Sequence, residues 1–463
     1  MSGRFLSKFT CGACLSVCII DNMIFRAQKA LYTMRCKVIK LKMKNRVCPI
    51  LSFNIFFLVI GFVLFEVSVR FLIDPSPISF GRLFGKELPP INLIPREIPP
   101  EPDRDDWVNG IIVKGKKITI GDLWGIQIED ELLGYEPAPN AASLNGWWKS
   151  NNIGAISSYR TEKSVASGAT RVLIFGDSFA QGSRVSLEES WHSVLQSLQS
   201  DLEVVNLGVD GYSVAQSYLR YQKIRELLDF DIVILLLSPR SGLWRGINVF
   251  RSLVVYWGLY NMMPRYVVRS DELQLVTSPY ASKSEFLENN VGELSVNARK
   301  HLSLYDSFYP DSCYDTPYDA PFLFGDLVSY KIVYQYFCDK KRNDLLNSLY
   351  DTQGEALQVY KRIFQEMKID IEINGGDFYL LILPEYEDVR ELKSNDAYIN
   401  IWNKMTSFLC SDGLKCLDLK GVFQNLPMKE IDRGYDQSHY GPIIHRKIAQ
   451  QTKEFLAREK LRE

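Results

Sequence analysis

The sequence predicts an α/β protein, namely a three-layer α/β/α unit built on a parallel sheet and preceded by a transmembrane helix and a small β accessory region. Apolar strand-like runs alternate with segments of helical periodicity, which is typical of a sheet covered on both faces. In residues 171–182 (RVLIFGDSFAQG) an apolar run meets a glycine turn, and a helical pattern follows. The N-terminus is basic and then free of charge, which indicates a membrane anchor.

The anchor prediction depends on charge. The basic side chains of residues 1–46 face a single acid, Asp21, and residues 47–65 carry no charge. About 20 apolar residues in a helix cross a bilayer, and a basic flank stays in the cytoplasm. We therefore expect a transmembrane helix over 47–73, a cytoplasmic segment 1–46 and a periplasmic or otherwise extracytoplasmic remainder, with Met34 and Met43 as alternative starts.

Two alternatives for the anchor are weaker. A cleaved signal peptide needs a short apolar region followed by a small-x-small cleavage site, which the sequence lacks. A buried core helix does not fit a charge-free run of this length beside a basic cluster.

Three regions follow the anchor. Repeated prolines in residues 74–106 disfavour helix and predict an extended stalk. Residues 107–165 form the accessory region, in which the alternation over 110–128 predicts a small hairpin. The main domain covers 166–463 and is interrupted at about 243–347 by an aromatic-rich insertion, which is either a lid or binding surface, or a small core of its own.

Apolar runs place five strands in the main domain. They cover residues 172–175, 202–207, 231–237, 378–383 and 415–419. Helical spacing follows or separates them at about 187–198, 212–228, 353–367, 399–409 and 444–456.

Composition excludes some functions. The 463 residues carry a net charge of −1, which argues against a nucleic-acid partner. Cys11 and Cys14 form a C-x-x-C, but no second pair with zinc-ligand spacing follows, so we expect no metal. Four cysteines lie beyond the anchor, and Cys410 with Cys416 is the expected disulfide because it closes a short loop.

Ser178 is the candidate nucleophile. It follows a buried strand and opens a helix, so it is displayed at the carboxyl edge of the sheet, where free N–H groups favour a developing negative charge. Gly-Asp-Ser is also ordinary turn and capping chemistry, so the tripeptide alone does not decide the function.

Asp436 and His439 are the candidate partners of Ser178. A serine nucleophile needs an imidazole base and a carboxylate that orients it. The other three histidines lie inside predicted helices or in the insertion: His192, His301 and His445. His439 alone lies on a loop beside an aspartate, near the expected sheet edge.

These blocks together resemble the SGNH, or GDSL-type, hydrolase family, in a membrane-anchored bacterial-type form. Gly176-Asp177-Ser178 is similar to the first block, Asn206 with Gly208 and Gly211 to the second, and Asp436-x-x-His439 to the last. The resemblance implies a five-stranded parallel sheet of flavodoxin-like order, no cofactor, and hydrolysis or transfer of acyl esters. It also implies Ser178 as nucleophile, His439 as base, Asp436 as its orienter, and the N–H groups of Ser178 and Gly211 as oxyanion donors.

One position departs from the family pattern. The third block ordinarily ends in Gly-x-Asn-Asp, whose asparagine gives a further oxyanion donor, but this chain has Ser238-Pro239-Arg240-Ser241. Arg240 therefore either donates to the oxyanion or turns away to pair with a carboxylate.

The sequence predicts a membrane-tethered, extracytoplasmic serine esterase. The expected substrate is an acylated carbohydrate, with O-acetyl groups of a cell-surface glycan as the leading candidate and a lipid ester as another. Two alternatives stay open: an O-acyltransferase that uses the same triad, and a non-catalytic envelope protein that binds or assembles glycans.

Overall fold

The computed structural model describes residues 49–76, 79–94, 111–113, 116–118, 127–143, 147–255, 262–309, 325–434 and 436–460. The chain divides into two compact units, Met1–Leu72 and Ile73–Glu463. The predicted cytoplasmic segment 1–46 and the Cys11/Cys14 pair lie outside the described residues.

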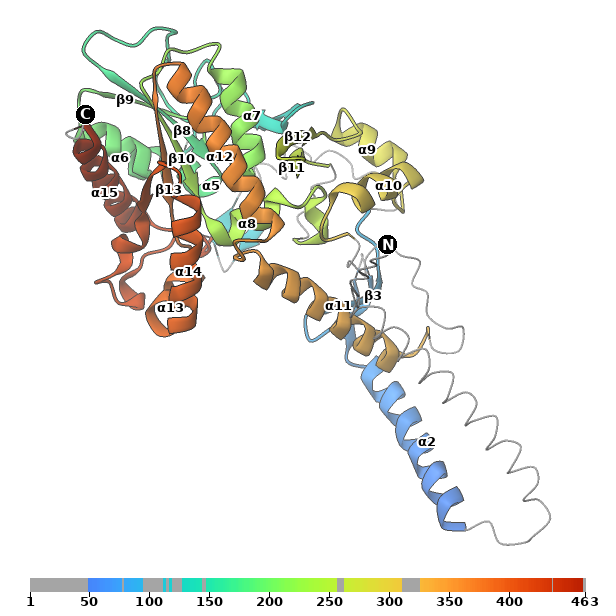
Figure 1. Ribbon diagram of the computed structural model, residues 1–463. Coiled ribbons are helices and arrows are strands. Elements are labelled where there is room, and N and C mark those ends of the chain that lie inside the picture. The colour runs from blue at the N-terminus through green and yellow to red at the C-terminus, as the bar shows by residue number, and fades with distance from the viewer. Residues whose placement is uncertain are drawn as a thin grey trace, which may run out of the picture. The chain divides into compact units, whose positions relative to one another are not determined.

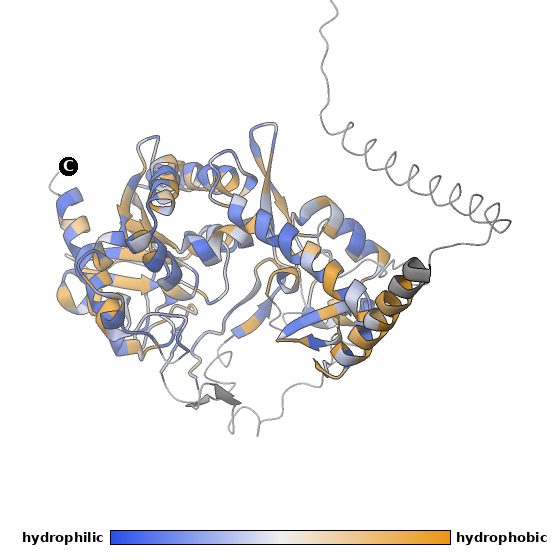
Figure 2. Ribbon diagram, turned by 90° about the horizontal axis from the view of Figure 1, so that it is seen from below, coloured by the Kyte–Doolittle hydropathy of each residue, from blue (hydrophilic) through white to orange (hydrophobic). Residues whose placement is uncertain are grey.

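The first unit contains the helix α2 (Pro49–Arg70). Its apolar side chains at residues 55–60 and 62–65 are exposed, and Figure 2 colours most of the helix as hydrophobic. Among the described residues, no helix combines the length and the apolar character that a membrane crossing requires. The transmembrane span predicted for residues 47–73 is therefore not supported here.

A five-stranded parallel sheet forms the centre of the second unit (Figure 1). In space the strands follow the order β14-β13-β10-β8-β9, and every neighbouring pair is parallel. In chain order this is 2-1-3-4-5, the flavodoxin-like order, so the predicted architecture is confirmed. The strands are β8 (Thr170–Gly176), β9 (Leu202–Asn206), β10 (Ile232–Leu237), β13 (Asp377–Ile382) and β14 (Lys415–Asp418).

Both faces of this sheet are buried because alternate side chains of each strand enter different cores. On β10, Val233, Leu235 and Leu237 join one hydrophobic cluster, and Ile234 and Leu236 join the other. The first cluster lies under α7 (Val214–Ile224), α8 (Pro239–Gly246), α12 (Glu355–Ile373) and α14 (Asp396–Leu409). The second lies under α5 (Ser178–Gln181), α6 (Trp191–Leu198), α13 (Tyr386–Ser394) and α15 (Pro442–Lys460).

The stalk prediction is wrong for its first part. Its described residues include a three-stranded antiparallel sheet of β1 (Ile73–Asp74), β2 (Ser79–Leu83) and β3 (Lys86–Ile91). The backbone of these strands is extended, as the prolines favour, but Ile91, Leu93 and Ile94 are buried in the first core cluster, so this segment packs on the domain and is not a solvent-exposed spacer. Residues 95–106 of the predicted stalk lie outside the described residues.

Two hairpins occupy the accessory region. The predicted hairpin within 110–128 is confirmed, since β4 (Ile111–Val113) pairs antiparallel with β5 (Lys116–Ile118). A second hairpin, β6 (Gln127–Asp130) with β7 (Gly134–Pro137), follows it.

The described aromatic rings of the insertion lie in different surroundings. Phe250, Tyr280, Phe286 and Phe308 are buried, and the rings of Phe250 and Phe286 lie 5.5 Å apart. Trp244, by contrast, lines a cavity, and Tyr336 and Phe337 are exposed. The insertion therefore shares features of both readings left open for it. Its elements are β11 (Arg265–Arg269), β12 (Glu272–Val276), α9 (Lys283–Asn289), α10 (Val296–Tyr305) and α11 (Val328–Ser348). Short 3-10 turns lie at Leu187–Glu189, Arg251–Leu253, Leu419–Phe423 and Met428–Glu430.

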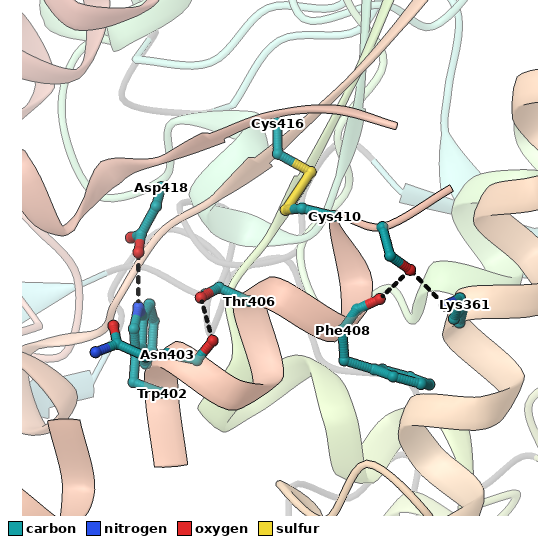
Figure 3. The surroundings of a disulfide bond; sticks show 9 residues. Lys361, Trp402, Asn403, Thr406, Phe408, Cys410, Cys416 and Asp418 are labelled. Atoms are coloured by element: carbon teal, nitrogen blue, oxygen red, sulfur yellow. Dashed lines mark hydrogen bonds between the residues drawn. A yellow bond between two sulfur atoms is a disulfide. The ribbon is translucent and has the colours of Figure 1, made fainter. Parts of the chain in front are cut away.

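The predicted disulfide between Cys410 and Cys416 is present (Figure 3). It joins the end of α14 to β14. Nearby, the Trp402 indole donates to Asp418 over 3.0 Å, which ties the same helix to the end of the same strand. The edge strand is therefore held at both of its ends.

Candidate active site

Ser178 lies at the turn between β8 and α5. Asp177 caps the helix by accepting the Phe179 N–H over 3.0 Å. A side chain at Gly176 would come within 2.5 Å of the Leu236 carbonyl oxygen and 2.6 Å of Ala180 Cβ, so only glycine allows this close turn. The serine is thereby presented at the carboxyl edge of the sheet, as predicted.

The loop before α15 carries Asp436 and His439. One Asp436 oxygen accepts the backbone N–H groups of Ser438 (2.9 Å) and His439 (3.1 Å), which closes a tight turn. The Phe179 ring lies 4.8 Å from the imidazole, centroid to centroid. These contacts fix the orientation of the imidazole before any substrate binds.

The structure brings the three predicted catalytic side chains together. His439 Nε2 lies 2.8 Å from Ser178 Oγ, and His439 Nδ1 lies 2.7 Å from Asp436 Oδ2. When His439 carries its proton on Nδ1 and donates it to Asp436, Nε2 is free to accept the serine hydroxyl proton. This is the geometry of a nucleophile, a base and an orienting carboxylate.

The Asp436 carboxylate is ionised. Burial alone would raise its pKa, but hydrogen bonds from His439 and Ser438 and the charge of Arg184 hold the pKa far below its ordinary value. A permanent negative charge at this position stabilises the imidazolium that forms when His439 takes a proton.

The other histidines lie in different surroundings. His192 and His445 are buried between α6 and α15, and burial lowers the pKa of each to about 3. His445 Nδ1 accepts the Trp191 N–H over 3.0 Å, and His192 Nε2 contacts Ser190 Oγ at 2.9 Å. The His301 ring lies 5.0 Å from the Tyr305 ring of the insertion, centroid to centroid. These contacts are structural.

The predicted backbone donors belong to two adjoining segments. Within the described part of the chain, neither the Ser178 N–H nor the Gly211 N–H donates to a protein acceptor. The loop after β9, which carries Gly211, presses against α5, because a side chain at Gly208 would lie 2.6 Å from the Gln181 nitrogen. The Val209 N–H also donates to the Gly176 carbonyl over 3.0 Å. Two backbone donors without a protein acceptor therefore lie on adjoining segments, one at the nucleophile itself and one on the loop packed against α5.

Arg240 pairs with a carboxylate, which is the second of the two alternatives predicted for it. Its Nε donates to Asp388 over 2.9 Å, and Asp388 is fully buried. Burial would lower the pKa of Arg240, but the Asp388 charge and hydrogen bond raise it above its ordinary value. The expected oxyanion contribution of Arg240 is therefore not supported by its main contact.

A cavity of about 470 Å³ opens at the catalytic side chains. Its apolar walls are Phe179, Trp244 and Val255. Its polar walls are Ser178, Arg184, Asp210, Arg240, Ser241, Arg245, Glu385, Asp436, Ser438 and His439. The volume and the mixed apolar and polar lining suit a small acyl group attached to a hydroxylated molecule.

Sequence reasoning missed two arginines at this cavity. Arg184 binds Asp436 (3.1 Å) and Asp210 (2.8 Å), so it links the catalytic loop to the loop of Gly211. Arg245 binds the buried Asp177 over 3.1 Å, next to the nucleophile. A buried arginine in a stretch of small residues is a weak sequence signal, since nothing local shows which acid it meets.

No metal site was expected. Within the described ranges, no group of three or more His, Cys, Asp or Glu side chains is arranged to hold a metal ion.

Comparisons with known proteins find solved structures of similar fold, but with low TM-scores. No protein-family model matches the sequence, and no curated protein matches it either. Among solved structures, an alpha/beta hydrolase enzyme from the metagenome of Lake Arreo, Spain, is 12% identical with a TM-score of 0.33; the match covers 63% of this chain and 96% of that one.

Two further solved structures are similar. A member of the lipolytic protein G-D-S-L family from Veillonella parvula is 11% identical with a TM-score of 0.30, covering 62% of this chain and 97% of that one. A catalytic mutant of an acetylxylan esterase from Geobacillus stearothermophilus is 12% identical with a TM-score of 0.30, covering 62% and 94%. Values this low decide neither the family nor the activity of this chain.

Proposed function

We propose that this protein is a serine acyl-ester hydrolase. The observation that carries the proposal is the pair of contacts made by His439, 2.8 Å to Ser178 Oγ and 2.7 Å to Asp436 Oδ2. These contacts lie at one end of a cavity large enough for a small ester.

The reaction follows from these positions. Ser178 Oγ attacks the ester carbonyl carbon while its proton passes to His439 Nε2. The carbonyl oxygen becomes an oxyanion, for which the N–H groups of Ser178 and Gly211 are the open donors. The tetrahedral centre collapses, the alkoxide leaves with the proton from His439, and an acyl-serine stays behind. Water then repeats the sequence, with His439 as base, and releases the acid.

We further propose O-acetyl groups of a glycan as the substrate. The cavity offers charged and hydroxyl side chains that can hydrogen-bond a hydroxylated alcohol, beside apolar surface that can hold a small acyl group. Trp244 of the insertion lines the cavity, whereas Phe250 and Phe286 are buried in a core, so support for sugar stacking rests on Trp244. A second candidate, acyl transfer to a sugar hydroxyl, uses the same triad and differs only in the acceptor.

One experiment separates these functions. The purified protein is given a small acetyl ester and an O-acetylated polysaccharide, with Ser178→Ala as control. Release of free acetate by the wild type alone supports the hydrolase, and a newly acetylated acceptor supports the transferase. Equal turnover by both proteins, or none by either, supports the non-catalytic alternative.

Membrane tethering through α2 and an extracytoplasmic location are separate proposals. The charge-free run 47–65, the basic flank before it and the exposed apolar side chains of α2 favour them. The Cys410–Cys416 disulfide fits an oxidising compartment. Fractionation of cells that express the full chain tests both proposals.

A further inference from the structure

The oxyanion loop, residues 208–212, is held by α5, by Arg184 just beyond it and by the accessory hairpin. The backbone N–H, the backbone carbonyl and the carboxylate of its central residue, Asp210, each make a hydrogen bond. The Asp210 N–H donates to Gln181 Oε1 over 2.6 Å, and its carboxylate accepts from Arg184 over 2.8 Å. The third contact comes from the accessory hairpin: the Tyr135 hydroxyl donates to the Asp210 carbonyl over 2.7 Å.

The Tyr135 contact matters because of peptide geometry. The Asp210 carbonyl and the Gly211 N–H belong to one peptide group, which is planar and trans, so they point in opposite directions. A hydroxyl that holds the carbonyl therefore fixes the direction of the N–H. It also polarises the peptide group, which makes the N–H a stronger donor.

The hairpin that carries Tyr135 is firmly attached to this loop. The Tyr135 and Tyr212 rings pack edge to face with centroids 5.4 Å apart, and the Tyr212 hydroxyl donates to the Tyr135 carbonyl. Gln216 donates to the Leu133 carbonyl over 2.7 Å. Leu133 is fully buried.

The fit between Tyr135 and Gly211 is close. A side chain at Gly211 would lie 2.6 Å from the Tyr135 hydroxyl oxygen, and Gly211 has φ +80. Burial raises the pKa of the Tyr135 hydroxyl, so the group stays protonated and can donate. The backbone of Gly211 and the hydroxyl of Tyr135 are therefore in close contact.

We propose that Tyr135 is a positioning residue: by holding the Asp210 carbonyl, its hydroxyl orients the Gly211 N–H as oxyanion donor. The inference rests on the proposed function and extends it, because it gives the accessory hairpin a part in the reaction. Tyr135 does not touch the reacting atoms, and it acts through the peptide it binds.

The test compares Tyr135→Phe with Tyr221→Phe in the full chain. Tyr221 is a matched control, since its hydroxyl donates to Asp370 of α12 over 2.6 Å and not to this loop. Loosening one donor costs less than deleting it, so we expect kcat for an acetyl ester to fall about tenfold in Tyr135→Phe with KM unchanged. Inhibition by a boronic acid, which forms a tetrahedral adduct, weakens by a similar factor. Tyr221→Phe keeps wild-type kcat.

A double variant gives a second readout. In Gly211→Ala the added carbon displaces the loop from the hydroxyl, so adding Tyr135→Phe should cost no further activity. If the activity losses of the two single variants multiply in the double variant, the proposal is overturned. A wild-type kcat in Tyr135→Phe would also overturn it.

Hydrogen exchange keeps the inference testable if no esterase activity is found. Peptides covering residues 207–213 should exchange faster in Tyr135→Phe and not in Tyr221→Phe. Unchanged exchange in both overturns the positioning claim by itself. Turnover that is absent or independent of Ser178 overturns the proposed function instead.

Discussion

Opposing effects act on the carboxylate of Asp436. Burial disfavours its charge, while His439, Ser438 and Arg184 favour it, and the partners prevail. The surrounding residues thus maintain an ionised acid where an isolated one would tend to be neutral. The hydrogen bonds and the Arg184 charge offset the cost of burying this carboxylate, and its charge holds one tautomer of His439.

Asp436→Asn should lower kcat by about a thousandfold or more without unfolding the protein. An amide of the same shape can donate to Nδ1, which moves the proton to Nε2 and leaves no base for Ser178. Steady-state kinetics on an acetyl ester measure the loss. Asp412→Asn, an exposed carboxylate paired with Lys361, is the control and should keep full activity. Similar activity in both variants contradicts the role given to Asp436.

Arg184→Lys should lower kcat about tenfold, and Arg184→Met should lower it further. The guanidinium reaches Asp210 and Asp436 together through two nitrogens, whereas an ammonium on a flexible stem cannot hold both. Initial rates with saturating ester give the ranking. Equal rates for the wild type and Arg184→Met would show that the link between the two loops is dispensable.

At the scale of elements, the sheet and the helix termini do most of the positioning. Ser178 follows β8, Gly211 follows β9, and His439 precedes α15. These segments meet because parallel strands end at one edge. The loop after β9 has no space to move toward α5.

Gly208→Ala should destabilise the protein by roughly 2–3 kcal/mol, since overpacking against backbone atoms costs about that much. The new carbon would lie 2.6 Å from the Gln181 nitrogen and 2.8 Å from the Ala180 carbonyl carbon. Urea denaturation measures the change. Gly421→Ala meets only the flexible end of Gln451 at 3.4 Å and should change stability little. An unchanged free energy of unfolding in Gly208→Ala would contradict the close contact between this loop and α5.

The packing of α6 on α15 should make stability depend on pH. His192 and His445 have folded pKa values of about 3, below the ordinary value of 6.5, so the unfolded chain binds more protons between these values. Stability therefore falls as pH drops, and from pH 7 to 5 each histidine should cost about 2 kcal/mol.

His445→Gln isolates one of these two contributions. Urea denaturation of the wild type and the variant at pH 7 and pH 5 should show a smaller loss in the variant, by about the share of one histidine. The same loss in both proteins would show that His445 is not buried in its neutral form.

The sequence was most informative where chemistry and periodicity coincide. The apolar runs predicted all five strands, and the scarcity of histidine singled out His439. It failed where contacts join distant residues: nothing near Arg184 or Tyr135 reveals the acid or carbonyl that each one meets. The prolines before Ile91 indicated a spacer, although the apolar residues among them are buried.

At the scale of the whole molecule, the proposed site is assembled over a sequence separation of 261 residues between Ser178 and His439. The second unit has its own two-sided core, so it contains the complete candidate site without α2. The proposed activity and the proposed membrane attachment are therefore separable.

A chain beginning at Ile73 should keep the kcat of the full protein and stay in the soluble fraction. If the tether proposal holds, the full chain sediments with membranes and is released by detergent but not by high salt. Activity and sedimentation measured on both chains check this. A full chain that stays soluble, or is released by salt, contradicts anchoring through α2.

The most direct test of the central claim is covalent labelling of the nucleophile. A fluorophosphonate, which mimics an ester and traps an activated serine, is incubated with the wild type, Ser178→Ala and His439→Ala, and the labelled peptide is identified by mass spectrometry. The proposed site predicts one label, on Ser178, lost in the first variant and strongly slowed in the second. A wild type that takes up no label, or a label that persists in Ser178→Ala, would contradict it.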